Sequence, residues 1–106
     1  MSALLAVISG PLLKDAMFPV DTEELFIGRD VDSGIRIPSK SVSRRHCCVR
    51  QKDGSVTLVD LDSRNGTFVN GSPVKERVLE HGDLIRVGDA YFRYVCLLYT
   101  SPSPRD

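Results

Sequence analysis

The sequence predicts an all-β fold, a β-sandwich of two antiparallel or mixed sheets whose functional loops gather at one end. Short runs rich in β-branched and aromatic residues recur along the chain. Turn-forming pairs such as Asp53-Gly54, Asn65-Gly66 and Asn70-Gly71 separate these runs at a spacing typical of a sandwich. No window of a dozen residues keeps a helical apolar period, so we expect at most a turn or two of helix.

Each strand is predicted from a short apolar run between two turn signals. The clearest hairpin lies around Asp53-Gly54, because the runs on both sides alternate apolar and polar residues. The same pattern recurs around Gly88-Asp89. The expected strands are, in chain order, LLAVIS at 4–9, LFIG at 25–28, IRI at 35–37, HCCVRQ at 46–51, VTLVDL at 56–61, TFVN at 67–70, LIRV at 84–87 and YFRYVCLL at 91–98.

The length of 106 residues fits one domain, which we place at residues 1–97. The apolar opening has no basic leader and is interrupted by Gly10 and Pro11, so we expect neither a signal peptide nor a membrane span. The end of the chain passes into Pro, Ser and Arg residues that do not suit a sheet. We expect residues 98–106 to be a disordered or non-native tail.

The composition argues against a strongly basic nucleic-acid-binding protein, a disulfide-stabilised protein and a zinc protein. The 14 basic and 14 acidic residues balance to a net charge of zero. The cysteines number three, and Cys47 is adjacent to Cys48, which does not suit a disulfide framework. We therefore expect these two cysteines to pack in a strand, and the chain to work in a reducing, cytoplasmic compartment. No His or Cys spacing matches a zinc motif, so we expect no metal and no cofactor.

Basic and hydroxyl side chains gather in three loops: one after LFIG, one at 38–46 and one at 60–71. Loops at one end of a sandwich come together, and function is usually carried there. Such a set of donors suits an anion with several oxygens, above all a phosphomonoester, because Arg forks and hydroxyls satisfy its oxygens directionally. The cations are Arg29, Lys40, Arg44, Arg45 and Arg64, and the neutral donors are Ser41, Ser43, Ser63 and Asn65.

Four successive motifs resemble those of the forkhead-associated (FHA) domain, a β-sandwich that binds phosphothreonine peptides. They are FIGRD at 26–30, SVSRRH at 41–46, DLDSRNGTFVNG at 60–71 and LEHGDLIRVG at 79–88. Each motif alone is weak, but their order and separation together are specific. The resemblance covers about residues 3–96. It implies a phosphopeptide-binding signalling module that recognises a Thr-phosphorylated protein or peptide, as a monomeric domain of a larger signalling protein.

The resemblance also implies roles for single residues. Arg29 would bind a phosphate oxygen, and Ser43 would donate its hydroxyl to the same group. Arg44 lies where the family commonly places another basic or polar group facing the phosphate. Asn65 would hold the backbone of the bound peptide with its side-chain amide. Arg64 joins the phosphate-binding candidates, although the family often has Ser or Thr there, and it would reach the phosphate from the rim or read an acidic residue beside it.

Other residues are expected to support the site. His46 resembles the family's structural histidine, buried and hydrogen-bonded so that it fixes the shape of the loops. Gly28 and Gly66 look like turn residues that do not contact the ligand. Val69 and Asn70 are candidates for the small apolar pocket that takes the γ-methyl of phosphothreonine.

Three other functions compete with this interpretation. An enzyme would need a nucleophile and an oxyanion hole, but no Gly-x-Ser-x-Gly elbow is present. A nucleic-acid-binding domain would carry excess positive charge and aromatics interleaved with its cations, which this chain lacks. A phosphate-independent interaction module of the same fold conflicts with the intact Arg29, Ser43 and Asn65. We therefore expect a binding module that is not an enzyme, with no nucleic acid and no membrane as partner.

Overall fold

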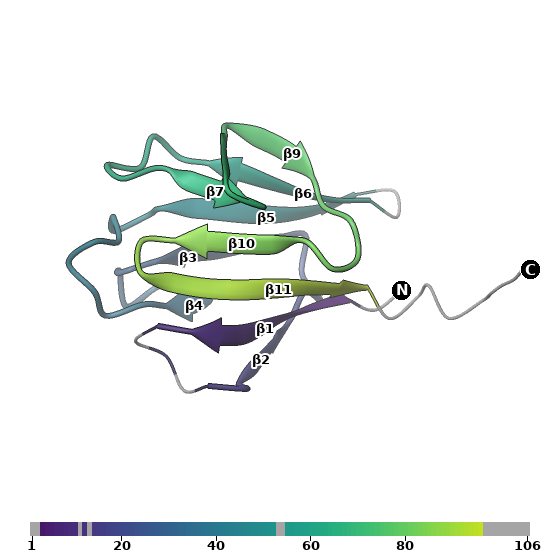
Figure 1. Ribbon diagram of the computed structural model, residues 1–106, viewed down its shortest axis with the longest axis horizontal. Helices are drawn as coiled ribbons and strands as arrows, with labels where there is room; N and C mark the ends of the chain where they lie inside the picture. Colours follow the sequence, from purple (N-terminus) through teal and green to yellow (C-terminus); the bar gives the residue numbers. More distant parts are fainter. Residues whose placement is uncertain (1–2, 11, 13, 53–54, 97–106) are drawn as a thin grey trace, which may run out of the picture.

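Two β-sheets packed face to face make up the part of the chain that the computed structural model describes, residues 3–10, 12, 14–52 and 55–96 (Figure 1). This confirms the predicted all-β sandwich. The strands are β1 (Ala3–Ser9), β2 (Met17–Pro19), β3 (Glu24–Gly28), β4 (Ile35–Arg36), β5 (Cys47–Lys52), β6 (Ser55–Asp60), β7 (Thr67–Val69), β8 (Ser72–Val74), β9 (Glu76–Val78), β10 (Leu84–Val87) and β11 (Ala90–Cys96).

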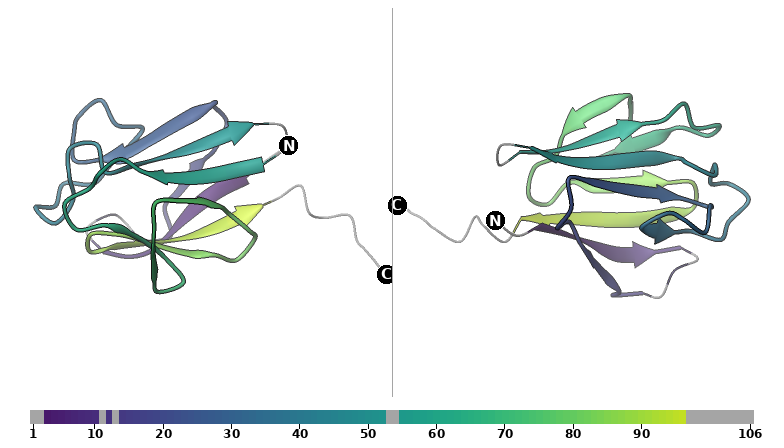
Figure 2. Two further views of the ribbon diagram at one scale, coloured as in Figure 1. Left: turned by 90° about the horizontal axis from the view of Figure 1, so that it is seen from above. Right: turned by 180° about the vertical axis from the view of Figure 1, so that it is seen from behind.

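One sheet has six strands in the order β2-β1-β11-β10-β7-β8, and the other has five in the order β4-β3-β5-β6-β9. The two layers are seen from above in the left view of Figure 2. The second sheet is mixed, because β3 pairs with β4 in parallel while β3–β5, β5–β6 and β6–β9 are antiparallel. Because β5 pairs antiparallel with both β3 and β6, the end of β3, the start of β5 and the end of β6 all lie at the same end of the sheet.

The core lies between the inner faces of the two sheets. Ala3, Leu5 and Val7 of β1 are buried, and the residues between them are only half-buried, which is the two-residue period of a strand with one face inward. Phe92 of β11 is the largest fully buried side chain. Cys47 is also fully buried in this core, and burial raises the pKa of its thiol, so the thiol stays protonated.

Turn residues lie where the sequence predicts them. The predicted hairpin of β5 and β6 is present, with Lys52 opposite Ser55, and residues 53–54 lie outside the described residues. Asn70 and Gly71 form a two-residue turn between β7 and β8, and both have positive φ, 52° and 87°. Glycine and asparagine are the residues that such a turn requires.

Three short strands were not predicted: β2, β8 and β9. Each forms an edge of its sheet. Pro19 and Pro73 stand in two of them, and β9 carries Glu76 and Arg77, so none shows an apolar β-branched run. Proline and charge are typical of edge strands, because they discourage pairing with further chains. The feature that suits these strands to an edge therefore also hides them from a search for apolar runs.

Within the described residues no helix has the length and apolarity that crossing a membrane requires. The same residues contain no group of three or more His, Cys, Asp or Glu side chains that could hold a metal ion. Cys47, Cys48 and Cys96 are free thiols. The expected tail at 98–106 and Pro11, which interrupts the apolar opening, lie outside the described residues.

Candidate functional site

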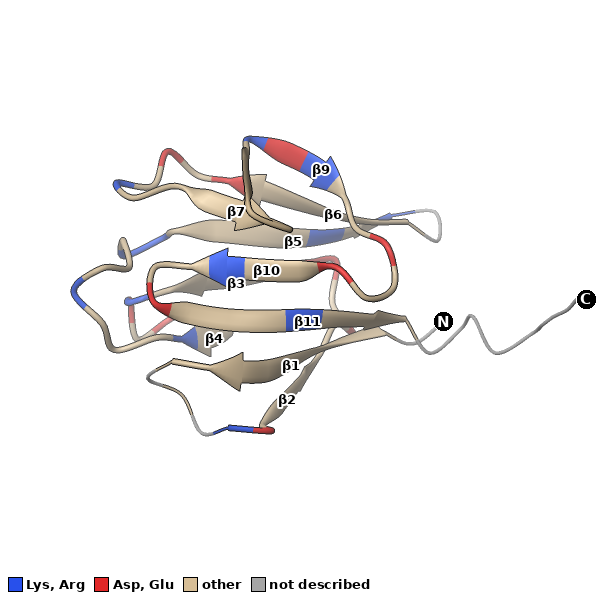
Figure 3. Cartoon of the chain, in the orientation of Figure 1, with Lys and Arg blue, Asp and Glu red and all other residues tan. Residues whose placement is uncertain are grey.

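Three connections meet at the end of the sheet where β3 and β6 end and β5 begins: residues 29–34, 37–46 and 61–66. Figure 3 shows basic residues on these connections at one end of the molecule, on the left of the view. The two views of Figure 2 also place the connections at a common end. The sandwich therefore brings together segments that are widely separated along the chain.

Backbone contacts join the end of β3 to the segment before β5. The N–H of Arg29 donates to the carbonyl of Ser43 at 3.0 Å, and the N–H of Asp30 donates to the carbonyl of Arg44 at 3.1 Å. Gly28 makes this approach possible. A Cβ at Gly28 would lie 2.0 Å from the carbonyl oxygen of Arg44, so a larger residue would push the two segments apart. The backbone of Arg29 is thus held at a fixed position relative to the backbone of Arg44.

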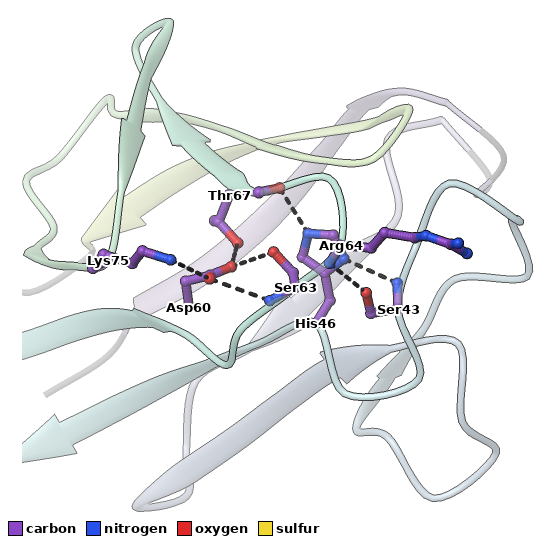
Figure 4. A network of polar contacts seen from close by, with 8 residues as sticks. Ser43, His46, Asp60, Ser63, Arg64, Thr67 and Lys75 are labelled. Carbon is purple, nitrogen blue, oxygen red and sulfur yellow. Dashed lines mark hydrogen bonds and ion pairs between the residues drawn. The ribbon is translucent and has the colours of Figure 1, made fainter.

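His46 links the second connection to the third (Figure 4). Its side chain is fully buried. The N–H of Ser43 donates to Nδ1 at 3.1 Å, so Nδ1 carries no proton and the other ring nitrogen must carry it. Nε2 accordingly donates to the carbonyl of Gly66 at 2.8 Å. One neutral imidazole therefore holds the backbone on both sides of the site.

Two further hydrogen bonds close the gap between the same connections. The N–H of Arg64 donates to Oγ of Ser43 at 2.9 Å, and Nδ2 of Asn65 donates to the carbonyl of Ser41 at 2.7 Å. In the first bond Ser43 acts as acceptor, so its own hydroxyl hydrogen remains available for a ligand. Asn65 likewise keeps its Oδ1 and one amide hydrogen. The protein therefore positions both side chains and still leaves each of them with hydrogen-bonding groups for a ligand.

Asp60, at the end of β6, anchors the third connection (Figure 4). Its carboxylate, only 2% exposed, accepts hydrogen bonds from the N–H and hydroxyl of Ser63 and from Oγ1 of Thr67, the last at 2.7 Å. Nζ of Lys75 lies 3.8 Å away. Burial acts to raise the pKa of Asp60, but the hydrogen bonds and Lys75 outweigh it and hold the pKa below its ordinary value. Asp60 is therefore a charged acceptor at neutral pH.

A hollow of about 310 Å³ lies between the three connections. No Asp or Glu lines it, so all of its charged lining residues are cations. The residues predicted to bind the phosphate or the peptide backbone all contribute to this wall: Arg29, Ser43, Arg44, Arg64 and Asn65. The predicted supporting residues do not line the hollow; His46 is fully buried, Gly28 is buried and Gly66 is half-buried. The lining residues are Arg29, Lys40, Ser41, Val42, Ser43, Arg44, Arg64 and Asn65.

The arginines of the described residues fall into two groups. Arg29, Arg44 and Arg64, which line the hollow, have no side-chain hydrogen bond, ion pair or ring contact with any described residue. Every other described arginine has one. Their partners are the carbonyl of Arg29 for Arg36, the Phe26 ring for Arg45, Glu24 for Arg50, Asp83 for Arg77, Gly88 and two aromatic rings for Arg86, and Gly82 for Arg93.

Two parts of the site were not foreseen correctly from the sequence. Val69 is a core residue, and Asn70 in the β7–β8 turn donates to the carboxylate of Asp83. Neither lines the hollow, whose apolar lining residue is Val42. The anchoring role of Asp60 was missed. A signal for it was present, because an Asp three residues before Ser63 is typical of a side chain that caps its own turn.

Comparison with known proteins gives the class to which this fold and site belong. The FHA domain family matches residues 25–88. A solved FHA domain studied for phosphothreonine-dependent interactions is 34% identical, with a TM-score of 0.83 over 91% of this chain and 97% of that domain. The FHA domain of FhaA, solved in complex with the intracellular domain of Rv3910, is 35% identical, with a TM-score of 0.81 over 88% of this chain and 99% of that one. The chain belongs to the FHA domain family.

Two longer bacterial proteins are also similar to it. The glycogen accumulation regulator GarA of Mycolicibacterium smegmatis is 41% identical over 105 residues, which is 99% of this chain and 63% of GarA. An oxoglutarate dehydrogenase inhibitor of Corynebacterium jeikeium is 42% identical over 96 residues, which is 91% of this chain and 65% of the inhibitor. The chain thus spans less than two thirds of the length of either relative.

Proposed function

We propose that this chain binds protein segments that carry a phosphothreonine, and that the phosphate occupies the hollow between the three connections. The observation that carries this proposal is the distribution of the arginines. The three whose side chains have no partner among the described residues, Arg29, Arg44 and Arg64, line one hollow that has no carboxylate in its wall. Unpaired cations held together in one place are expected where a multiply charged anion binds.

Each side chain has a defined task in this proposal. The guanidinium groups of Arg29 and Arg44 bind phosphate oxygens, and Arg64 adds positive charge at the rim. Ser43 donates the hydroxyl hydrogen that its contact with Arg64 leaves available. Asn65 binds the backbone of the peptide with the atoms that its contact with Ser41 leaves available. After ordering costs, such contacts correspond to a Kd of about 1 to 10 μM.

Val42 provides a reason for preferring phosphothreonine to phosphoserine. It is an apolar residue among the polar lining of the hollow, and its position is fixed by burial in the core. Contact with the γ-methyl of threonine would remove one methyl group from water, worth about 0.8 kcal/mol. This corresponds to a preference of about fourfold.

We infer that the chain works as a binding module within a larger signalling protein and has no catalytic activity of its own. The names of two relatives, a regulator and an inhibitor, support this inference. We also place the domain, residues 1–97, in the cytoplasm. The free thiols of Cys47, Cys48 and Cys96 support a reducing compartment.

Two steps test the proposal: a screen of the domain against an oriented phosphothreonine peptide library, and calorimetric titration of the selected peptides. The peptides selected from the library should bind with micromolar affinity, and their unphosphorylated counterparts should not bind measurably. Phosphoserine versions should bind about fourfold more weakly. Equal affinity for phosphorylated and unphosphorylated peptides would favour a phosphate-independent interaction module. Affinity for random DNA that falls steeply with salt would favour nucleic-acid binding.

A further inference from the structure

The hollow carries more positive charge than one phosphate balances. A phosphomonoester has a charge of about −1.5 to −2 at neutral pH. The hollow is lined by four cations, Arg29, Lys40, Arg44 and Arg64, and by no carboxylate. None of the four has an ion pair with a described residue. Two positive charges are therefore left over when a single phosphate is bound.

Arg64 is the cation best placed to serve a different group. Its backbone is fixed, because its N–H bonds Oγ of Ser43 and its loop is held by Asp60 through Ser63. Its side chain is exposed and extends away from the Asp60 network (Figure 4). A long side chain on a fixed backbone at the rim reaches beyond the space that the phosphate fills.

The phosphate itself is already supplied with donors. Arg29 and Arg44 each present a planar fork, and Ser43 presents a hydroxyl hydrogen, for the three free oxygens of one phosphate. Adding Arg64 to the same oxygens would bring a third guanidinium close to two others, and like charges at such distances repel. A second anion beside the first would instead stabilise all four cations.

We propose that Arg64 binds a second anionic group on the same peptide, within two residues of the phosphothreonine. This inference rests on the proposed function. The group is a planar or multiply oxygenated anion, either the carboxylate of Asp or Glu or a second phosphate, because a guanidinium fork matches both bidentately. The chain would then select phosphothreonine segments with acidic or doubly phosphorylated neighbours.

Ratios of dissociation constants test this proposal. A peptide selected from the library is made in versions with Ala, Glu or a second phosphothreonine at each position within two residues of the phosphothreonine. Each version is titrated by calorimetry into the wild type, Arg64→Thr and Lys52→Gln. Lys52 is a matched control, because it is an exposed cation at the far end of β5 and does not line the hollow. A uniform change in phosphate affinity cancels in the Ala-to-Glu ratio.

For the wild type we expect at least one position at which the anionic residue tightens binding by about fivefold over Ala, the upper range for an exposed ion pair. The ratio should fall to about one in Arg64→Thr and should be kept in Lys52→Gln. The Glu and phosphothreonine versions distinguish a carboxylate site from a second phosphate site.

Three results would overturn the proposal. One is a wild-type ratio near one at every position. Another is a ratio that persists in Arg64→Thr, which would mean long-range attraction without a fixed contact. The third is a ratio that falls equally in Lys52→Gln. A requirement for phosphothreonine that survives any of these results leaves the proposed function intact, so the two failures are distinguishable.

Discussion

The arginine side chains of this domain show which part of its surface is reserved for a ligand. Most described arginines are held by carbonyls, carboxylates or rings, as expected for a residue that carries several donors. Arg29, Arg44 and Arg64 lack such partners and surround one hollow. A protein gains no stability from grouping three unpaired cations. Their grouping is best understood as preparation for an anion.

Arg29→Ala should abolish measurable phosphopeptide binding, a loss of about 100-fold or more, because two charge-assisted hydrogen bonds are removed. The melting temperature should stay within a few degrees, since the side chain is exposed and has no partner among the described residues. Calorimetry and thermal unfolding measure the two quantities. Lys52→Ala removes the same charge at the far end of β5 and should bind normally. Normal binding by Arg29→Ala would mean that the phosphate does not occupy this hollow.

His46→Ala should lower both stability and affinity. The substitution leaves the N–H of Ser43 and the carbonyl of Gly66 without their partner and opens a cavity in a fully buried position. We expect a loss of about 2–4 kcal/mol in the free energy of unfolding. Chemical denaturation measures this loss, and calorimetry at a temperature where the variant is folded measures the affinity. An unchanged free energy of unfolding would contradict a supporting role.

At the scale of single residues, the sequence predicted the members of the site better than their contacts. Arg29, Ser43, Arg44, Arg64 and Asn65 were all expected at the ligand, and all line the hollow. Their roles toward a phosphate stay predictions. Contacts such as that from the backbone of Arg64 to the hydroxyl of Ser43 depend on how two loops dock, and no local pattern in the sequence encodes that docking.

At the scale of elements, the site depends on how closely β3 approaches the segment that precedes β5. Gly28→Ala would place a Cβ 2.0 Å from the carbonyl oxygen of Arg44, so the backbone must shift. We expect a loss of about 1–3 kcal/mol in stability and a clear loss of phosphopeptide affinity, because the displaced segment carries Ser43 and Arg44. Denaturation and calorimetry on the same sample measure both.

Gly71→Ala is the matched control for Gly28→Ala. Gly71 has a φ of 87°, and apart from its two chain neighbours no described residue has an atom within 4 Å of the position of its Cβ. Alanine there should cost stability through local backbone strain but should leave phosphopeptide affinity unchanged. If both variants lose affinity equally, the contact at Gly28 has no special importance for the site.

The β6–β7 loop gives a pH-dependent prediction. The pKa of Asp60 is lower in the folded state than in the unfolded chain, so its contribution to stability is present above pH of about 4 and is lost as the pH falls through the folded value. Asp60→Asn should therefore be less stable than the wild type by about 1–3 kcal/mol at pH 7. The difference should shrink as the pH falls below about 4.

Urea denaturation between pH 2 and 7, values chosen to bracket the pKa of a carboxyl group near 4, measures this difference. Asp21→Asn serves as the control, because Asp21 is exposed and has no side-chain contact with a described residue. It should follow the wild type at each pH. A constant difference between Asp60→Asn and the wild type across the whole range would show that the charge of Asp60 is not what holds the loop.

The strands with buried faces are those that the sequence predicts. β1, β5, β6, β10 and β11 carry alternating or continuous apolar runs, because one or both of their faces are buried. The missed strands are three-residue edges with proline or charge, whose pairing is supplied by a neighbour and not by their own composition. Prediction therefore succeeded where burial determines the sequence and failed where tertiary pairing determines the structure.

At the scale of the whole molecule, the sandwich works as a rigid frame for three loops. The alternation of strand direction across β3, β5 and β6 places their connections at one end of the sheet, although residues 29 and 65 lie far apart in the sequence. The sequence predicted that the loops would meet, because loops at one end of a sandwich generally do. It could not supply the hollow of about 310 Å³, which arises from the packing of the three loops.

We propose above that Arg29, Ser43 and Asn65 act together on one phosphothreonine peptide, Arg29 and Ser43 on its phosphate and Asn65 on its backbone. Titrating isotope-labelled protein with a selected phosphothreonine peptide and following its backbone amide signals by NMR tests this claim directly. The amide signals of Arg29, Ser43 and Asn65 should shift together, and the shifts should saturate at one peptide per chain. The signals of Lys52 and its neighbours should stay unchanged. The unphosphorylated peptide should cause no shifts. Shifts confined to another face, or equal shifts with the unphosphorylated peptide, would contradict the claim.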